Sequence, residues 1–493
     1  MKLWKNGVFH TMLSEKDIKY QMATHQGYIV GFDQQVSDFE FDEIIDLKGY
    51  HIYPGFVDAH LHLLGFGQKL SRPNLMNIKD KKEVVKIIKN AFGDEPLFIE
   101  GYFECGLTKI DLNRISQHYP IMIRHNDYHS LTVNDVVLDM INQESSSGIL
   151  TEQAAQKAMD SYPKHSNQAL EKMLENSIKK LNSYGITGGH SDDLYYFNGF
   201  KETLRVFDRV LDKMPFRAHL LVHHMVLDEY LKSRRVQLNQ TSYLQIGAIK
   251  MFYDGTISSK TALLKNKYLN SDSFGMRIHE IKTFESMVKK VRANDLTVAI
   301  HVIGDQALLE VLDILKKYPP LDGLHDRLIH TSLMDSKAIE MMKDMPISID
   351  VQPQFVSSDL PGALDYLSET PELVYPWKTL VDHHINIAGS SDAPVEVPNP
   401  LFGIYSAVTR ISDVDHQVYF KKEALSRFEA IKLYTKYANY STMDPNRGFL
   451  EKGFIADLSI FEENLEETII ENLKKNICYM TVIDECINYK KSY

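Results

Sequence analysis

The sequence has 493 residues, of which 44% are apolar and 25% are charged, and its formal net charge is −11. These values are typical of a globular protein, and the negative charge argues against a nucleic-acid-binding surface. The three cysteines, Cys105, Cys478 and Cys486, cannot all pair and do not have the spacing of a zinc ribbon. Neither a secretory signal pattern nor an apolar run of about 20 residues occurs. We therefore expect a cytoplasmic protein that binds neither nucleic acid nor membrane, and its assembly into a homo-oligomer stays open.

The two ends of the chain share one kind of pattern. Segments such as "QGYIVGFDQ" near the N-terminus alternate apolar and polar residues and are separated by turn residues. The C-terminal segments "GFIADLSIFEENL" and "ICYMTVIDECINY" look alike. Because chain termini often lie near each other, we expect residues 1–53 and 445–493 to form one composite β-sandwich domain.

Eight short apolar runs rich in β-branched residues follow, with amphipathic helical segments between many of them. Strands that alternate with helices predict βα units and a parallel sheet. Eight such units predict an α/β fold with a closed (β/α)₈ TIM-type barrel over residues 54–444. The predicted strands are 55–62, 185–191, 217–224, 244–255, 296–305, 327–333, 346–354 and 385–394.

Two further runs do not fit the count of eight. "PLFIEGYF" and "IMIRHND" lie in the long gap between the first and second barrel strands, and a helical segment at 150–162 follows them. We interpret about 66–165 as an insertion after the first barrel strand that covers one mouth of the barrel.

The first predicted barrel strand ends in two histidines, His60 and His62. With 20 histidines in the chain, about one such pair arises by chance, so the pair is informative only through its context. Side chains alternate along a strand, so Asp58, His60 and His62 point to the barrel interior at the end where barrel enzymes place their chemistry. The two imidazoles there either bind one metal ion or form a hydrogen-bonded pair in the core. Asp58 either orients one imidazole or is an ordinary polar residue at a strand end.

Four other predicted strands end in a metal-competent or basic group: Lys250, His301, His330 and Asp392. Because the carboxyl ends of barrel strands converge, we expect these side chains to meet at one mouth. A free ammonium repels a cation, so Lys250 can serve a metal only after its amine has reacted with CO₂ to give a carbamate. Otherwise Lys250 binds an anionic substrate or caps a helix.

These motifs resemble the amidohydrolase superfamily and, within it, amidohydrolase family 3, the YtcJ-like metal-dependent hydrolases. The resemblance covers almost the whole chain and implies a (β/α)₈ barrel with a composite β-sandwich. The segments that carry it are "PGFVDAHLHL", "IKMFYDGTISSKTALL", "AIHVIGDQA", "RLIHTSL" and "GSSDAPVEVPNPLFGIYSAVTR".

The resemblance also implies one or two divalent metal ions per subunit. By position, His60, His62 and Asp392 would bind one ion, His301 and His330 would bind the other, and a carboxylated Lys250 would bridge them. Zinc is the first choice, although histidine and carboxylate ligands also suit iron, manganese and nickel.

The implied reaction is hydrolysis of a carbon–nitrogen bond other than a peptide bond, in a small amide, cyclic amide or N-acyl compound. A metal-activated hydroxide would attack the carbonyl carbon, and Asp392 would take its proton and deliver it to the leaving amine. The alternatives left open are an ester hydrolase or a single-metal deaminase on the same barrel, and a catalytically idle binding scaffold. Lys250 weighs against the deaminase.

Three residues are predicted to contact the substrate. His129, in "NDYHSLTVN", matches a segment of the insertion that would face the active site, and is otherwise a surface-loop histidine. Asp254 positions the carbamate or the substrate, or caps the following helix. Tyr102 is the third predicted contact, at a position where the family often has tryptophan. The family also usually has an acidic residue where this chain has Ile329. These two departures leave the substrate preference unpredicted.

Overall fold

The chain is built around a sheet of eight parallel strands. The computed structural model describes residues 1–492 except 74, 77, 127–129 and 234–241. The order in the sheet is β21-β19-β17-β16-β15-β14-β13-β8, which follows the chain from the first barrel strand to the last. The N–H of Asp392, just beyond β21, donates to the carbonyl oxygen of His60 in β8 at 2.8 Å. The chain therefore has the (β/α)₈ barrel that the sequence predicts. The barrel strands are β8 (Phe56–Leu61), β13 (Ile186–Ser191), β14 (Arg217–His223), β15 (Leu244–Phe252), β16 (Val298–Val302), β17 (Asp326–His330), β19 (Ile347–Val351) and β21 (Asn386–Gly389).

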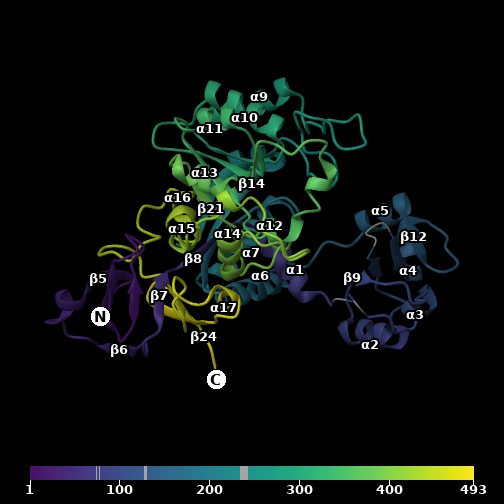
Figure 1. Ribbon diagram of the computed structural model, residues 1–493. Coiled ribbons are helices and arrows are strands. Elements are labelled where there is room, and N and C mark those ends of the chain that lie inside the picture. Colours follow the sequence, from purple (N-terminus) through teal and green to yellow (C-terminus); the bar gives the residue numbers. More distant parts are fainter. Residues whose placement is uncertain (74, 77, 127–129, 234–241, 493) are drawn as a thin grey trace. The chain divides into compact units, whose positions relative to one another are not determined.

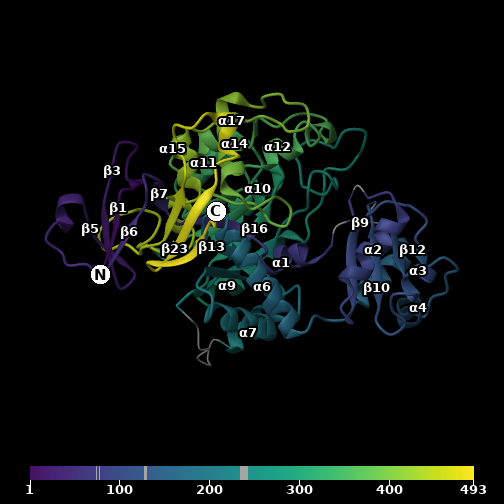
Figure 2. The same cartoon turned by 90° about the horizontal axis from the view of Figure 1, so that it is seen from below.

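Amphipathic helices lie outside the strands, as Figure 2 shows. In α7 (Phe200–Leu211) the buried residues Phe200, Leu204, Phe207 and Leu211 recur at the spacing that places them on one face. No helix of the described residues is both long and apolar enough to cross a membrane. The other helices of the barrel part are α8 (Leu227–Ser233), α9 (Ile281–Arg292), α10 (Asp305–Lys317), α11 (Ser336–Met342), α12 (Phe355–Asp359), α13 (Trp377–Asp382), α14 (Pro400–Thr409), α15 (Arg427–Leu433) and α16 (Lys436–Tyr440).

The barrel interior combines polar side chains with an apolar cluster and a buried ion pair. The polar side chains of the site lie at the strand C-termini. The apolar cluster is made of Leu221, Ala248, Ala299 and Ile329. Beside it, the guanidinium of Arg327 donates to the carboxylate of Asp350 at 2.8 Å in a buried ion pair. Arg327 and Asp350 stand opposite Ala299 and Ile329 on the neighbouring strands, so the cluster and the ion pair share one level of the barrel.

The two chain ends form a β-sandwich together. A sheet of order β5-β4-β1-β6 packs on a sheet of order β24-β23-β22-β7-β2-β3. N-terminal β7 pairs antiparallel with C-terminal β22, so the second sheet is composite (Figure 1, purple beside yellow). The strands are β1 (Lys2–Lys5), β2 (Val8–His10), β3 (Ile18–Lys19), β4 (Met22–His25), β5 (Tyr28–Phe32), β6 (Glu43–Asp46), β7 (His51–Pro54), β22 (Leu458–Phe461), β23 (Cys478–Ile483) and β24 (Cys486–Lys490). Buried side chains of both sheets, including Trp4 and Phe9 from one end of the chain and Leu458 from the other, form a common core.

Residues Gly67–Asn176 form a second compact unit, whereas Met1–Phe66 and Ser177–Tyr493 form the first. The second unit contains a sheet of order β12-β11-β10-β9. Its elements are α2 (Lys81–Ala91), β9 (Leu97–Tyr102), α3 (Lys109–Asn113), β10 (Ile121–His125), β11 (Ser130–Val133), α4 (Asp135–Ile141), β12 (Ile149–Thr151) and α5 (Glu152–Asp160). The helices α1 (Leu63–Ser71) and α6 (Asn167–Asn182) contain the points where the chain passes from one unit to the other.

Candidate active site

The mouth of the barrel gathers the side chains that the sequence singles out. Each lies in or just beyond the C-terminal half of a barrel strand, where the strands converge. The six are His60, His62, Lys250, His301, His330 and Asp392.

His60, His62 and Asp392 bring one ligand atom each to within 4.8 Å of one another. Oδ1 of Asp392 lies 3.4 Å from Nε2 of His60 and 3.7 Å from Nε2 of His62. Ligand atoms bound tetrahedrally at 2.0–2.1 Å to one zinc ion are about 3.4 Å apart. The three side chains therefore have the spacing of ligands around a shared ion.

His301 and His330 stand next to each other on the neighbouring strands β16 and β17. Their ring centroids are 4.6 Å apart, and the His330 ring is 5.7 Å from that of His60. Nδ1 of His330 lies 2.8 Å from Oε1 of Gln352, and because an amide oxygen only accepts, Nδ1 carries the proton. Nε2 of His330 is then left with its lone pair free.

Lys250 lies between the two groups of histidines. Its Nζ is 3.5 Å from Nε2 of His60 and 3.5 Å from Oδ2 of Asp192, and all three side chains are buried. Asp192 directly follows β13 in the segment "HSDD". Asp192 is not among the residues predicted from the sequence, although it has the same pattern as Asp392, an acidic residue at the end of a barrel strand.

Burial sets the protonation of the imidazoles. It lowers the pKa of His62 to about 4 and that of His301 to about 4, and the charge of Lys250 acts in the same direction. Burial likewise lowers the pKa of His60 and of His330 well below the usual range. The four rings are therefore neutral at pH 7, which is the form that binds metals.

Two of these residues have a strained backbone. His330 has φ 75° and Asp392 has φ 53°, both in the left-handed region. This region is uncommon for residues other than glycine, although histidine and aspartate enter it more often than most. Such strain costs about 1–3 kcal/mol per residue and clusters at functional sites, so the chain holds these two side chains in place against a local preference.

The side chains of Asp58 and Asp254 accept hydrogen bonds from main-chain N–H groups. Asp58 accepts the N–H of Ser391 at 3.1 Å and the N–H of His60 at 3.2 Å, and so links β8 to the loop after β21. It is hydrogen-bonded to neither imidazole of the His60–His62 pair in the described contacts. Asp254 is buried and accepts three main-chain N–H groups, those of Leu263, Ile303 and Gly304. It does not line the cavity at the mouth, and instead fixes the loop that does.

The other two predicted substrate contacts belong to the second unit. Tyr102 is buried in β9, and its hydroxyl accepts the N–H groups of Cys105 and Leu107, both at 2.9 Å. These bonds hold the turn after β9. His129 lies outside the described residues.

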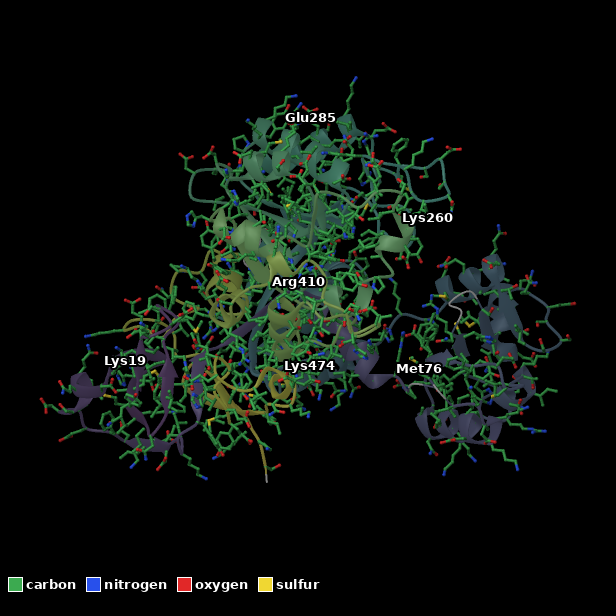
Figure 3. All side chains as sticks on the ribbon, in the orientation of Figure 1. Lys19, Met76, Lys260, Glu285, Arg410 and Lys474 are labelled. Atoms are coloured by element: carbon green, nitrogen blue, oxygen red, sulfur yellow. The ribbon has the colours of Figure 1, made fainter. Side chains whose placement is uncertain are left out.

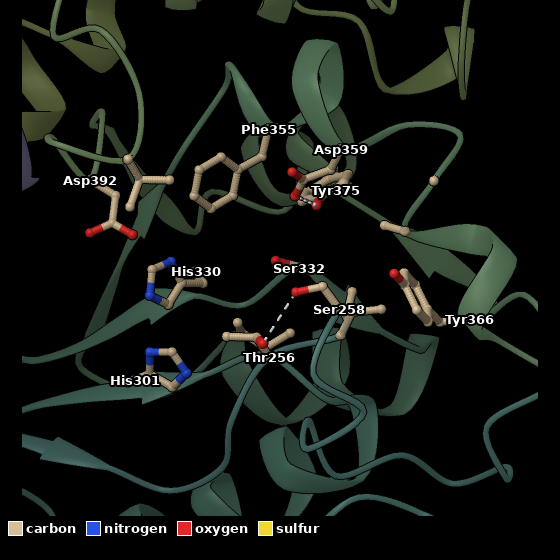
Figure 4. A pocket seen from close by; sticks show the side chains of 15 residues that line it. Thr256, Ser258, His301, His330, Ser332, Phe355, Asp359, Tyr366, Tyr375 and Asp392 are labelled. Carbon is tan, nitrogen blue, oxygen red and sulfur yellow. Dashed lines mark hydrogen bonds between the residues drawn. The ribbon is translucent and has the colours of Figure 1, made fainter. Parts of the chain in front are cut away.

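A cavity of about 390 Å³ opens beside the imidazoles (Figure 4). It is within the range of small-molecule sites, which are mostly apolar with a few polar groups. Its lining includes His301, His330 and Asp392 together with Phe355 and Ile303. Ile329, the departure noted in the sequence, belongs to the buried apolar cluster of the barrel interior and does not line this cavity.

The amidohydrolase family model matches residues 43–489 of this chain. The chain belongs to the amidohydrolase family. It is 34% identical to YtcJ of Bacillus subtilis (strain 168) over 99% of both chains. It is 22% identical to the N-substituted formamide deformylase of Arthrobacter pascens, over 91% of this chain and 90% of that one. An uncharacterized metal-dependent hydrolase from Pyrococcus horikoshii OT3 has a similar structure, with a TM-score of 0.82 and 25% identity over 95% and 99% of the two chains.

This amidohydrolase is accordingly a metal-dependent hydrolase with a TIM-type barrel. Asp192 and Gln352 are members of its site that sequence reasoning missed. Gln352 directly follows β19 in "DVQPQ", at the C-terminal end of a barrel strand, but its neutral amide is neither of the metal-competent nor of the basic types that mark the other strand ends. Only its 2.8 Å contact with His330 identifies it.

Proposed function

We propose that this amidohydrolase hydrolyses a non-peptide carbon–nitrogen bond of a small amide, cyclic amide or N-acyl compound, with divalent metal held at the barrel mouth. The spacing of His60, His62 and Asp392, at 3.4 and 3.7 Å between the facing ligand atoms, is the observation that carries this proposal. The name of the formamide deformylase relative supports the choice of an amide-like bond for this fold.

The donor set fits a divalent ion. His60, His62 and Asp392 would hold one ion, and His301 and His330 would take part in holding a second. All four rings are neutral at pH 7 because burial lowers their pKa. Imidazoles and a carboxylate suit zinc as well as manganese, iron or nickel. When bound, such ions acidify water and polarise a carbonyl oxygen.

Asp392 is the residue proposed to move the proton. Its side chain lines the cavity, and its backbone is fixed by the hydrogen bond of its N–H to His60. A carboxylate held in this way takes a proton from the attacking water and returns it to the leaving amine as the C–N bond breaks. Water thereby adds across the bond to give a carboxylic acid and a free amine.

Lys250 is proposed to carry a carbamate. Its Nζ is buried beside His60 and Asp192, at 3.5 Å from each. A neutral lysine amine reacts with CO₂ to form the carbamate and release a proton. The product would be an anionic group beside His60 that offers the divalent metal a further ligand.

The test is metal analysis combined with a substrate screen. We expect about two equivalents of metal in the purified protein and turnover of formamides, N-acyl compounds or cyclic imides with added zinc or manganese, abolished by a chelator. One equivalent with ring deamination would favour the deaminase alternative, and ester turnover without amide turnover would favour the esterase. Protein without metal that turns over none of these would overturn the proposal in favour of an idle scaffold.

A further inference from the structure

The cavity has two chemically different sides. His301, His330 and Asp392 lie on one side of it in Figure 4, whereas Asp359, Tyr366 and Tyr375 lie on the other. A substrate whose scissile bond is at the imidazoles therefore extends its other end toward Asp359. The groups around Asp359 decide which kind of end is accepted.

Asp359 brings a carboxylate to that remote side without a cationic partner among the described lining residues. Its Oδ2 accepts the hydroxyl of Tyr375 at 3.2 Å, and among the described residues its other oxygen has a weak contact, at 3.5 Å, with the hydroxyl of Ser358. The described lining includes neither lysine nor arginine. Burial raises the pKa of Asp359, as expected for a carboxyl group that lacks a compensating positive charge.

Aromatic rings complete the remote side. Tyr366 and Tyr375 line the cavity near Asp359, and Phe355, whose ring stacks on that of His330 at 6.2 Å between centroids, lies between the two sides (Figure 4). The negative face of an aromatic ring attracts cations, and Tyr366 already has one such partner. The ammonium of Lys260, labelled in Figure 3, lies 5.9 Å from the centroid of that ring. A carboxylate beside aromatic rings is a chemical environment suited to an organic ammonium group and unfavourable for a carboxylate.

We propose that the remote side of the cavity binds a cationic nitrogen of the substrate, so that the preferred substrate is an N-acylated amine with an ammonium or amidinium group at its far end. This inference rests on the proposed function for the scissile bond, and it narrows the substrate class. N-acyl amino acids that direct a carboxylate to Asp359 are excluded from the preferred substrates.

Binding of probes that lack a scissile bond tests the subsite independently of catalysis. Phenethylamine, phenethyl alcohol and phenylacetate have similar apolar parts and differ in the charge of the end group. By calorimetry on the metal-loaded protein, we expect phenethylamine to bind about tenfold to a hundredfold more tightly than the alcohol, the range of a charge-assisted hydrogen bond. Phenylacetate is expected to bind most weakly of the three.

Variants of Asp359 test whether its carboxylate causes the preference for the ammonium probe. Asp359→Asn should abolish the preference for the ammonium probe over the alcohol, whereas Asp359→Glu should retain part of it. Asp365→Asn is the matched control, because Asp365 is exposed in the same loop and does not line the cavity. An equal affinity of the unmodified protein for all three probes would overturn the inference without any variant. A preference that survives in Asp359→Asn would also overturn it, since the amine would then be bound elsewhere.

A kinetic series separates this inference from the proposed function. N-formyl derivatives of an alkanediamine, an amino alcohol and an amino acid of equal chain length differ only in the far end. The ammonium derivative should have the highest kcat/KM, and Asp359→Asn should reduce its advantage over the alcohol. Turnover of the three at equal rates would reject the subsite and keep the hydrolase. Ammonium-selective binding without turnover of any derivative would keep the subsite and count against the hydrolase.

Discussion

The main chains of His60 and Asp392 are joined by a 2.8 Å hydrogen bond, and the facing atoms of their side chains are 3.4 Å apart. A second bond, from the N–H of His62 to the carbonyl oxygen of Ala393 at 2.7 Å, continues the connection. These bonds join the ends of the first and the last barrel strands. The barrel is therefore closed by hydrogen bonds between residues of the proposed metal site. Metal binding should therefore be measurable as stability of the fold.

Zinc addition should raise the melting temperature of the chelator-stripped protein. A ligand present at a hundred times its dissociation constant stabilises the folded state by about 2.7 kcal/mol. We expect His60→Ala to remove most of this increase in a thermal melt. His118→Ala, which changes an exposed histidine, is the control and should keep it. An equal increase in melting temperature in His60→Ala would show that His60 is not a metal ligand.

Asp392→Asn should lower turnover by about a hundredfold to ten-thousandfold, which is the usual contribution of a general acid–base residue. Asparagine accepts the positive φ of this position and keeps an oxygen toward His60, so fold and metal content should be retained. The readouts are kcat/KM and metal content by mass spectrometry. Near-normal turnover in this variant would reject Asp392 as the proton carrier, and Asp365→Asn should be as active as the unmodified protein.

Lys250→Ala should lose bound metal, because the proposed bridging carbamate cannot form. Bicarbonate combined with a short acid such as acetate should restore part of the metal binding and activity, since a small carboxylate can take the vacated space. Protein grown with carbon-13 bicarbonate should show a carbamate signal by NMR that is absent from the variant. Two normally bound metals in Lys250→Ala would disprove the carbamate.

Gln352→Leu should weaken metal binding by about tenfold to a hundredfold, which is the usual effect of removing the partner of a ligating histidine. The amide oxygen of Gln352 fixes the proton of His330 on Nδ1 at 2.8 Å. Gln352→Glu keeps an acceptor at the same place and is the matched variant, with a smaller expected loss. Competition for zinc with a chromogenic chelator measures both, and equal affinity in Gln352→Leu and the unmodified protein would show that His330 needs no such partner.

Asp254→Asn should destabilise the protein by about 1–3 kcal/mol, the cost of leaving a buried N–H group unsatisfied. Asparagine turns an N–H donor toward at least one of the main-chain donors of Leu263, Ile303 and Gly304. Denaturant unfolding is the measurement. Asp272→Asn, which changes an almost fully exposed carboxylate paired with Lys267, should alter stability by less than about 0.5 kcal/mol. Equal effects of the two substitutions would contradict the structural role of Asp254.

The barrel could be predicted from the sequence because its signal is local. Each strand carries its own run of β-branched residues, and the polar residues that matter follow those runs at the C-terminal ends, as His301 does in "VAIHVIGD". The eight predicted strands all occur in the structure, and the apolar run before His60 is the first of them. The alternation of side chains along a strand likewise placed His60 and Asp58 on the interior side.

The contacts among these residues were decided by the tertiary structure alone. Asp192 directly follows β13, whereas Gln352 and Asp359 both lie in the connection after β19, Asp359 at the end of α12. Their positions in the sequence do not show that their side chains contact Lys250, His330 and the cavity. Asp254 shows the converse, because its position after Lys250 suggested a contact with a bound molecule, whereas its carboxylate holds a loop. The sequence by itself determined which residue types stand at the ends of the strands, because hydrophobic periodicity is a short-range property. The partners and spacing of those residues depend on how distant strands close into the barrel, and that closure is set by packing across the whole chain.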